Sequence, residues 1–145
     1  MSDSPSAAGH DAPIVSLGMP VYNGERYVRE AIRSALAQSI RDIEVVISDN
    51  ASTDGTEQIC REFAAADPRV RYFRNPTNVG AHPNFNLAFN RSRGRYFKWL
   101  AHDDLLHPDY LQQCVAVLDA DPGVVLCQSD LACIDESGER IGVIP

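Results

Sequence analysis

The chain has 145 residues, 44% hydrophobic and 23% charged, which is enough for one domain with a buried core. Its net charge of −7 and its single lysine, Lys98, argue against a nucleic-acid polymer as partner, because phosphate backbones repel an acidic surface. No apolar stretch approaches the roughly 20 residues that span a bilayer, and the first residues lack the basic and apolar segments of a secretory signal. We expect residues 1–12 to form a disordered tail.

Short apolar runs alternate with helical patterns along the rest of the chain. The predicted order is strand 13–19, helix 25–38, strand 43–48, helix 53–66 capped by Thr53 or Asp54, strand 70–75, helix 83–92, strand 96–101, helix 107–120, and strands 124–129 and 131–135 followed by a turn at 136–138. Strands separated by helices of this length pair in parallel, with helices on both faces. We therefore predict an α/β fold with an open, mainly parallel sheet over residues 13–145.

The four cysteines form no CxxC pair. They are Cys60, Cys114, Cys127 and Cys133, and all fall in strand-like or helix-like patterns. We expect reduced, mostly buried thiols of a cytoplasmic protein rather than a zinc site.

Polar loops, most of them with a glycine, follow the first four predicted strands. In an open α/β sheet, ligands bind beyond the carboxyl ends of the strands, so these loops form the expected binding edge. Their polar residues and glycines are Tyr22, Asn23 and Gly24 after the first strand, Asp49, Asn50, Ser52 and Asp54 after the second, Asn75, Asn78, Gly80 and Asn84 after the third, and Asp103 and Asp104 after the fourth.

The carboxylates of these loops have two interpretations, one structural and one functional. Asp103 and Asp104 can cap the following helix, or they can hold Mg²⁺ or Mn²⁺ against a phosphate, since such cations prefer hard oxygen ligands. Asp49 can form an Asx turn or a helix cap, although as the first polar residue after its strand it is less well explained by capping. Neither G-x-x-x-x-G-K-[ST] nor G-x-G-x-x-G is present, which argues against a P-loop and against a dinucleotide dehydrogenase.

The stretch "SLGMPVYNGERYVREAIRSALAQSIRDIEVVISDNASTDGT" resembles the opening of family 2 glycosyltransferases, an inverting family with the Rossmann-like glycosyltransferase-A fold. "DPRVRYFRNPTNVG" and "RGRYFKWLAHDDLLHPDYL" continue the resemblance, which covers residues 14–142. It implies binding of a nucleoside-diphosphate sugar, a UDP-sugar above all, with Mn²⁺ or Mg²⁺ as cofactor. The acceptor would be a glycan, a lipid or another hydroxyl compound.

Residue by residue, the resemblance implies that Pro20, Tyr22 and Asn23 line the nucleotide pocket and that Asp49 hydrogen-bonds the base. Asn78 and Gly80 would lie near the nucleotide, Asp103 would contact the ribose or the metal, and Asp104 would contact the metal. Ala101 stands where the commonest form of the family's acidic motif has an aspartate. The family's general base lies far downstream of this motif, so we expect it beyond Pro145 and expect this chain to be the donor-binding piece of a longer enzyme. Such an enzyme would work in the cytoplasm or at the cytoplasmic face of a membrane.

Two other functions fit the pattern less well. The chain could be a non-catalytic binding or assembly module that recruits another chain, or forms a homodimer, through an exposed sheet edge. A nucleotidyltransferase would need a glycine-rich, basic loop after the first strand, and "PVYNGER" contains only Arg26.

Overall fold

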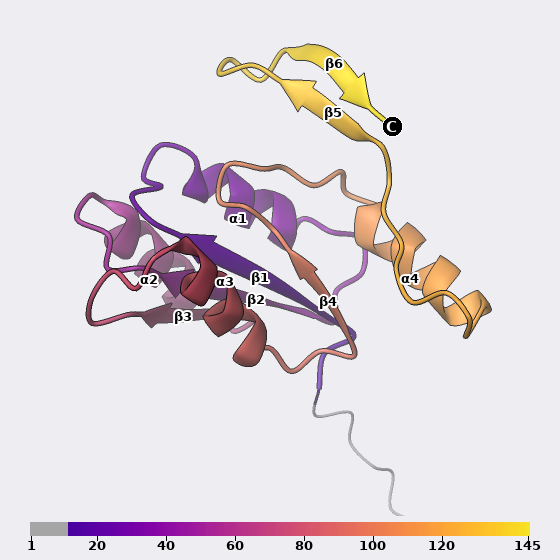
Figure 1. Ribbon diagram of the computed structural model, residues 1–145, viewed down its shortest axis with the longest axis horizontal. Helices are drawn as coiled ribbons and strands as arrows, with labels where there is room; N and C mark the ends of the chain where they lie inside the picture. The colour runs from indigo at the N-terminus through magenta and orange to yellow at the C-terminus, as the bar shows by residue number, and fades with distance from the viewer. Residues whose placement is uncertain (1–11) are drawn as a thin grey trace, which may run out of the picture.

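A computed structural model describes residues 12–145, so all but the last residue of the predicted tail lies outside the described part. Six strands and four helices follow one another along the chain (Figure 1): β1 (Val15–Val21), α1 (Val28–Leu36), β2 (Ile43–Asp49), α2 (Thr56–Ala66), β3 (Val70–Arg74), α3 (Ala81–Asn90), β4 (Tyr96–Trp99), α4 (Tyr110–Ala120), β5 (Leu131–Ile134) and β6 (Arg140–Ile144).

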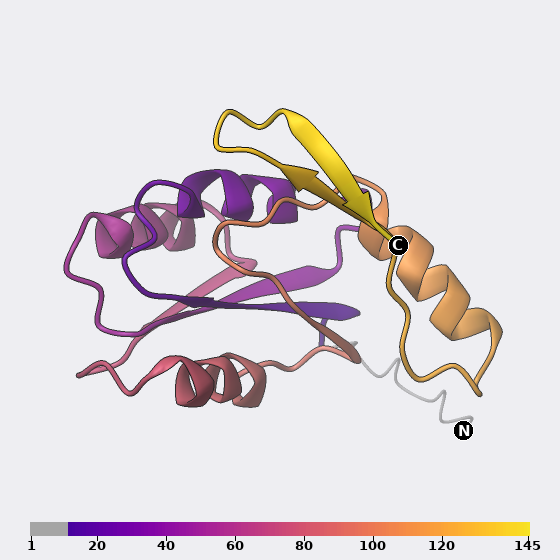
Figure 2. The same cartoon turned by 45° about the horizontal axis from the view of Figure 1, so that its top comes forward.

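The first four strands form one parallel sheet in the order β3-β2-β1-β4, which confirms the predicted open α/β architecture. Pairing of β1 with β2 runs from Val15 opposite Ile43 to Val21 opposite Asp49. Helices α1 and α2 cover one face of this sheet and α3 covers the other (Figure 2). Because all four strands run in the same direction, their carboxyl ends share one edge.

The core lies between the central strands and α1. Every residue of β1 and of β2 is buried, as expected for strands covered on both faces. Val28 and Ile32 of α1 are fully buried and Leu36 partly so, which confirms the four-residue spacing predicted from the sequence. Three of the helices start later than predicted: α1 at Val28, α2 at Thr56 and α4 at Tyr110.

The chain after α4 differs from the sequence prediction. Residues 124–129 form no strand, and Val125 in this stretch is 93% exposed. Only β5 of the two predicted strands forms, and it pairs antiparallel with β6, which was not predicted, in a hairpin separate from the main sheet (Figure 1). An apolar run becomes a strand only where its backbone finds a partner, and 124–129 meets none.

The cysteines are free, but their burial differs from the expectation. Cys60 is buried in the core, whereas Cys114, Cys127 and Cys133 are partly exposed. Within residues 12–145, no helix is both long and apolar enough to cross a membrane.

Candidate functional site

The loops at the carboxyl ends of the parallel strands surround a cavity of about 480 Å³. This volume is typical of small-molecule sites. Five of the seven residues predicted to bind a nucleotide line it: Pro20, Tyr22, Asn78, Gly80 and Asp103. The remaining lining residues are Val21, Asn50, Ala81, Asn84, Phe85, Ala101 and His102. We call this the main cavity.

Tyr22 and Gly80 contribute different surfaces to the main cavity. The Tyr22 side chain is 46% exposed, so its ring is free to contact a planar ligand. Gly80 has a φ of 89°, a conformation that favours glycine, and its N–H donates to Asn78 Oδ1 at 2.9 Å. The loop before α3 is therefore held in a fixed shape beside the cavity.

The predicted metal ligands lie in a turn directly after β4, where the Asp104 N–H donates to the Ala101 carbonyl at 3.1 Å. Both carboxylates are exposed, and neither makes a hydrogen bond or an ion pair with another residue of the described chain. Asp103 borders the main cavity, whereas Asp104 does not. Within residues 12–145, no three His, Cys, Asp or Glu side chains are grouped to hold a metal ion.

Asp103 also borders a second cavity, of about 370 Å³, which lies between α1 and the β5–β6 turn. Its walls include Tyr27, Glu30 and residues 134–138. Asp103 is the one residue that lines both cavities.

His102 lies where the loop after β1 approaches the loop after β4. A Cβ added to Gly24 would sit 2.5 Å from His102 Cδ2 and 2.7 Å from Val21 Cγ2. Glycine at this position therefore lets the histidine pack against the first loop while it lines the main cavity.

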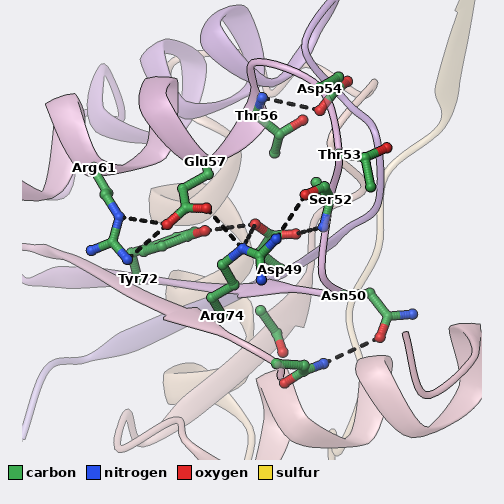
Figure 3. A network of polar contacts seen from close by, with 12 residues as sticks. Asp49, Asn50, Ser52, Thr53, Asp54, Thr56, Glu57, Arg61, Tyr72 and Arg74 are labelled. Atoms are coloured by element: carbon green, nitrogen blue, oxygen red, sulfur yellow. Dashed lines mark hydrogen bonds and ion pairs between the residues drawn. The ribbon is translucent and has the colours of Figure 1, made fainter. Parts of the chain in front are cut away.

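Asp49 is not brought together with Asp103, contrary to the sequence expectation. Its side chain is fully buried at the end of β2, where Oδ1 accepts from the Ser52 N–H at 2.9 Å and Oδ2 accepts from Tyr72 Oη at 2.6 Å (Figure 3). Arg74 Nε lies 3.9 Å from Oδ2. Each oxygen thus accepts a hydrogen bond within the protein, the side chain has no exposed surface, and Asp49 does not line the main cavity.

The physical reason is the pleat of the strand. Successive side chains of a strand point to opposite faces, so Asp49 and Asn50 diverge (Figure 3). Asp49 faces the α2 side, and Asn50, one residue later, lines the cavity on the α3 side.

The buried Asp49 carboxylate perturbs its neighbours. Burial raises the pKa of the Cys60 thiol to about 12, and the charges of Asp49 and Asp54 add to this effect. Burial and the hydrogen bond to Asp49 raise the pKa of Tyr72 in the same way. Both groups therefore stay neutral at physiological pH.

Asn23 serves as a brace between the first two loops rather than as a wall of the cavity. At a φ of 51°, its N–H donates to Ser52 Oγ at 3.0 Å, and its Oδ1 accepts from the Thr53 N–H at 2.8 Å. The Gly24 N–H adds a bond to Thr56 Oγ1 at 2.8 Å. Asn23, which the resemblance also placed at the nucleotide, therefore links the loop after β1 to the loop after β2 and does not line the main cavity.

Neither residue predicted to cap α2 is its N-cap: the helix begins at Thr56 with Gly55 as N-cap and no side-chain cap hydrogen bond, and Asp54 lies in the turn just before it. Its carboxylate accepts from the N–H groups of Thr56 and Glu25, each at 3.1 Å. Burial alone would raise the pKa of Asp54, and hydrogen bonds from Thr56 and Glu25 lower it overall.

Four lining residues that sequence reasoning did not assign to the pocket are Asn50, Asn84, Phe85 and His102. Asn50 and Asn84 stood among the polar residues of the expected edge, and strand alternation would have separated Asn50 from Asp49. Nothing in the sequence pattern distinguished Phe85 from a core residue of α3.

Comparison with known proteins places the chain in a family. The model of "Glycosyl transferase family 2" matches residues 16–142. An uncharacterized glycosyltransferase of Rickettsia typhi is 37% identical over 133 residues, which cover 90% of this chain and 40% of that protein. Chondroitin synthase of Escherichia coli is 36% identical over 136 residues, covering 94% of this chain and 20% of the synthase. The chain thus spans less than half the length of either relative.

Solved structures agree in fold. The crystal structure of S. aureus TarS 1-349 in complex with UDP has a TM-score of 0.68 at 28% identity, over 73% of this chain and 32% of that chain. The mannosyltransferase PcManGT from Pyrobaculum calidifontis, in complex with GDP-Man and Mn²⁺, has a TM-score of 0.70 at 27% identity, over 86% and 36%. The glycosyltransferase-A fold expected from the sequence is confirmed, and the chain belongs to glycosyl transferase family 2.

Proposed function

We propose that this chain is the donor-binding part of a glycosyltransferase, which binds a nucleoside-diphosphate sugar through a divalent cation for inverting transfer to an acceptor hydroxyl. The observation that carries the proposal is the main cavity, which gathers Pro20, Tyr22, Asn78, Gly80 and Asp103 at the carboxyl ends of parallel strands. The solved structures of relatives with UDP, UDP-GlcNAc and GDP-Man support a nucleotide sugar as the ligand class. The family match leaves the nucleotidyltransferase alternative without support.

The charges of the site support a cation. No residue that lines either cavity is lysine or arginine, and Asp103 contributes a negative charge to both. A diphosphate would therefore meet repulsion unless a cation lay between it and the protein. The exposed carboxylates of Asp103 and Asp104 are the hard oxygen donors that Mg²⁺ and Mn²⁺ take, and substrate phosphates commonly complete the shell. When bound, such an ion offsets the negative charge that develops on a leaving diphosphate.

The chain's own part in the reaction is to bind and orient the donor. On this proposal the exposed Tyr22 ring lies beside the base, the fixed loop of Asn78 and Gly80 lies along the nucleotide, and Asp103 holds the diphosphate end through the ion. Fixing the donor lets an acceptor hydroxyl attack from the opposite face of the sugar. A general base is commonly worth about 10²–10⁴ in rate; we assign none to this chain, and the acceptor stays a glycan, lipid or other hydroxyl compound. The four free cysteines support a cytoplasmic location.

Calorimetric titration with UDP tests the proposal. We expect binding that requires Mn²⁺, that is lost in excess EDTA, and that weakens about tenfold or more in Asp103→Ala and Asp104→Ala, because each loses a charged ligand. Asp130→Ala removes the same charge at an exposed position outside both cavities and should bind as the unchanged chain does. Absence of UDP binding, or Mn²⁺-dependent binding that survives both substitutions, would refute the assignment.

A second candidate function, assembly as a homodimer, is favoured by the free edge of the main sheet. Within residues 12–145, β4 pairs with β1 only; its last residue, Trp99, is 47% exposed, and Phe89 of α3 is 51% exposed. An unpaired edge with exposed aromatic side chains is a surface that a second copy could cover. Light scattering on the purified chain would give a mass twice 15.9 kDa if this holds, and the monomer mass if it does not.

A further inference from the structure

A group of three buried asparagines lies on the α3 side of the main cavity, which two of them, Asn50 and Asn84, line. Asn50, Asn75 and Asn84 are all 3% exposed or less. Asn75 Nδ2 donates to Asn84 Oδ1 at 2.9 Å, and Asn84 Nδ2 donates to the Ser48 carbonyl at 2.8 Å. This network of uncharged side chains joins the end of β2, the end of β3 and the first turns of α3.

Asn50 uses its whole carboxamide to hold the loop before α3. Its Nδ2 donates to Asn78 Oδ1 at 2.8 Å and to the Gly80 carbonyl at 3.2 Å. Its Oδ1 accepts from the Val79 N–H at 2.9 Å and from Asn75 Nδ2 at 3.2 Å. Two donors and two acceptor positions are all that a carboxamide has, so each is used within the protein.

A carboxylate in place of this carboxamide would fail at half of these contacts. An ionised aspartate accepts hydrogen bonds but donates none, so the bonds to Asn78 Oδ1 and the Gly80 carbonyl would become contacts between oxygens. The bonds from Val79 and Asn75 would remain. The loop of residues 78–80 would therefore be pushed away from the end of β2.

The same contacts orient Asn78. Its Oδ1 accepts from Asn50 Nδ2 and from the Gly80 N–H, and its Nδ2 donates to no other residue of the described chain. The polar atom that Asn78 leaves for a ligand is thus an N–H donor, which suits a carbonyl oxygen or a ring nitrogen of a nucleobase.

We propose that Asn50 is a positioning residue: it holds the Asn78–Gly80 loop as an uncharged, donor-bearing wall against which the base of the nucleotide packs. This inference rests on the proposed nucleotide site and extends it, because it assigns base recognition to the loop and gives Asn50, whose polar atoms all bond within the protein, the role of fixing that loop rather than of bonding the ligand.

The first test needs no ligand. Hydrogen exchange measured by NMR should be faster by about tenfold or more at the Val79 amide in Asn50→Ala, which removes its acceptor, and at the Gly80 amide in both Asn50→Ala and Asn50→Asp, since Asn78 and the Gly80 carbonyl lose the donor that holds them. Asn86→Asp adds the same charge at an exposed position of α3 outside the cavity and should leave both rates unchanged. Unchanged exchange in both Asn50 variants would overturn the positioning role, whether or not the chain binds nucleotide.

The second test separates the base from the diphosphate. UDP with Mn²⁺ should bind about tenfold or more weakly to Asn50→Ala, which removes the bonds to the loop without adding a charge, whereas inorganic pyrophosphate with Mn²⁺ should bind within about twofold of the unchanged chain, because it does not reach the loop. Equal losses for both ligands would overturn the inference, since they would indicate general damage to the site, and so would an unchanged affinity for UDP. If the unchanged chain binds neither ligand, the proposed function fails, and the exchange experiment alone decides the role of Asn50.

Discussion

Replacing Asp49 by alanine should destabilise the fold and leave nucleotide binding intact. The substitution removes two hydrogen bonds to a fully buried carboxylate, from the Ser52 N–H at 2.9 Å and from Tyr72 Oη at 2.6 Å. Bonds to a charged group are worth about 1.5–3 kcal/mol each, so we expect the free energy of unfolding to fall by about 3–5 kcal/mol. Arg74 adds little to this loss, because it keeps its closer ion pair with Glu57 at 2.8 Å.

Urea denaturation measures this loss, and titration with UDP and Mn²⁺ at a temperature where the variant stays folded measures the binding. Asp49→Asn is the matched control: its Oδ1 can accept from Ser52 and its Nδ2 can donate to Tyr72 Oη, so we expect a smaller loss of about 1–2 kcal/mol. A variant with the stability of the unchanged chain but much weaker UDP binding would show that Asp49 contacts the base, and would refute the reasoning.

Three further predictions concern the fold around the site. In Gly94→Ala the new Cβ would lie 2.6 Å from the Ser16 backbone nitrogen, so overpacking should cost about 1–3 kcal/mol in urea denaturation. The raised pKa of the Cys60 thiol contributes stability that is fully present below pH 9.0. Above pH 9.0 the thiol ionises in the unfolded chain but not in the folded one, so the free energy of unfolding should fall by about 1.4 kcal/mol per pH unit until about pH 12. Cys60→Ala should show a shallower slope over the same range. Glu44→Ala should cost about 3–5 kcal/mol, because it leaves Arg71, which lies 2.8 Å from this buried carboxylate, without its partner; Glu62→Ala, which breaks an exposed ion pair with Arg29, should cost far less.

The main sheet could be predicted because each local signal agreed with the tertiary arrangement. Apolar runs such as 43–48 were buried on both faces, and helices between them required parallel pairing. The end of the chain could not be predicted in the same way. The run 124–129 is as apolar as the true strands, yet strand formation depends on a neighbouring backbone, which a sequence pattern does not show.

The site was predicted at the level of loops and less well at the level of side chains. Pro20, Tyr22, Asn78, Gly80 and Asp103 line the main cavity as the resemblance implied. At the end of β2, Asp49 is buried and Asn50 lines the cavity, so one position of shift exchanges a buried side chain for one at the cavity. Side chains alternate between the two faces only as far as the backbone stays extended. The backbone conformation changes just after the strand, where Ala51 has a φ of 62°.

The stretch from Ser48 to Ser52 supports two polar networks of different character. On the α2 side, Asp49 accepts a hydrogen bond from Tyr72 and lies near Arg74, and its side chain has no exposed surface. On the α3 side, Asn50 supports the cavity wall with a neutral carboxamide. The charge of Asp49 thus lies on the face of the sheet opposite the cavity wall, and Asp103 is the only carboxylate among residues 12–145 that lines the main cavity.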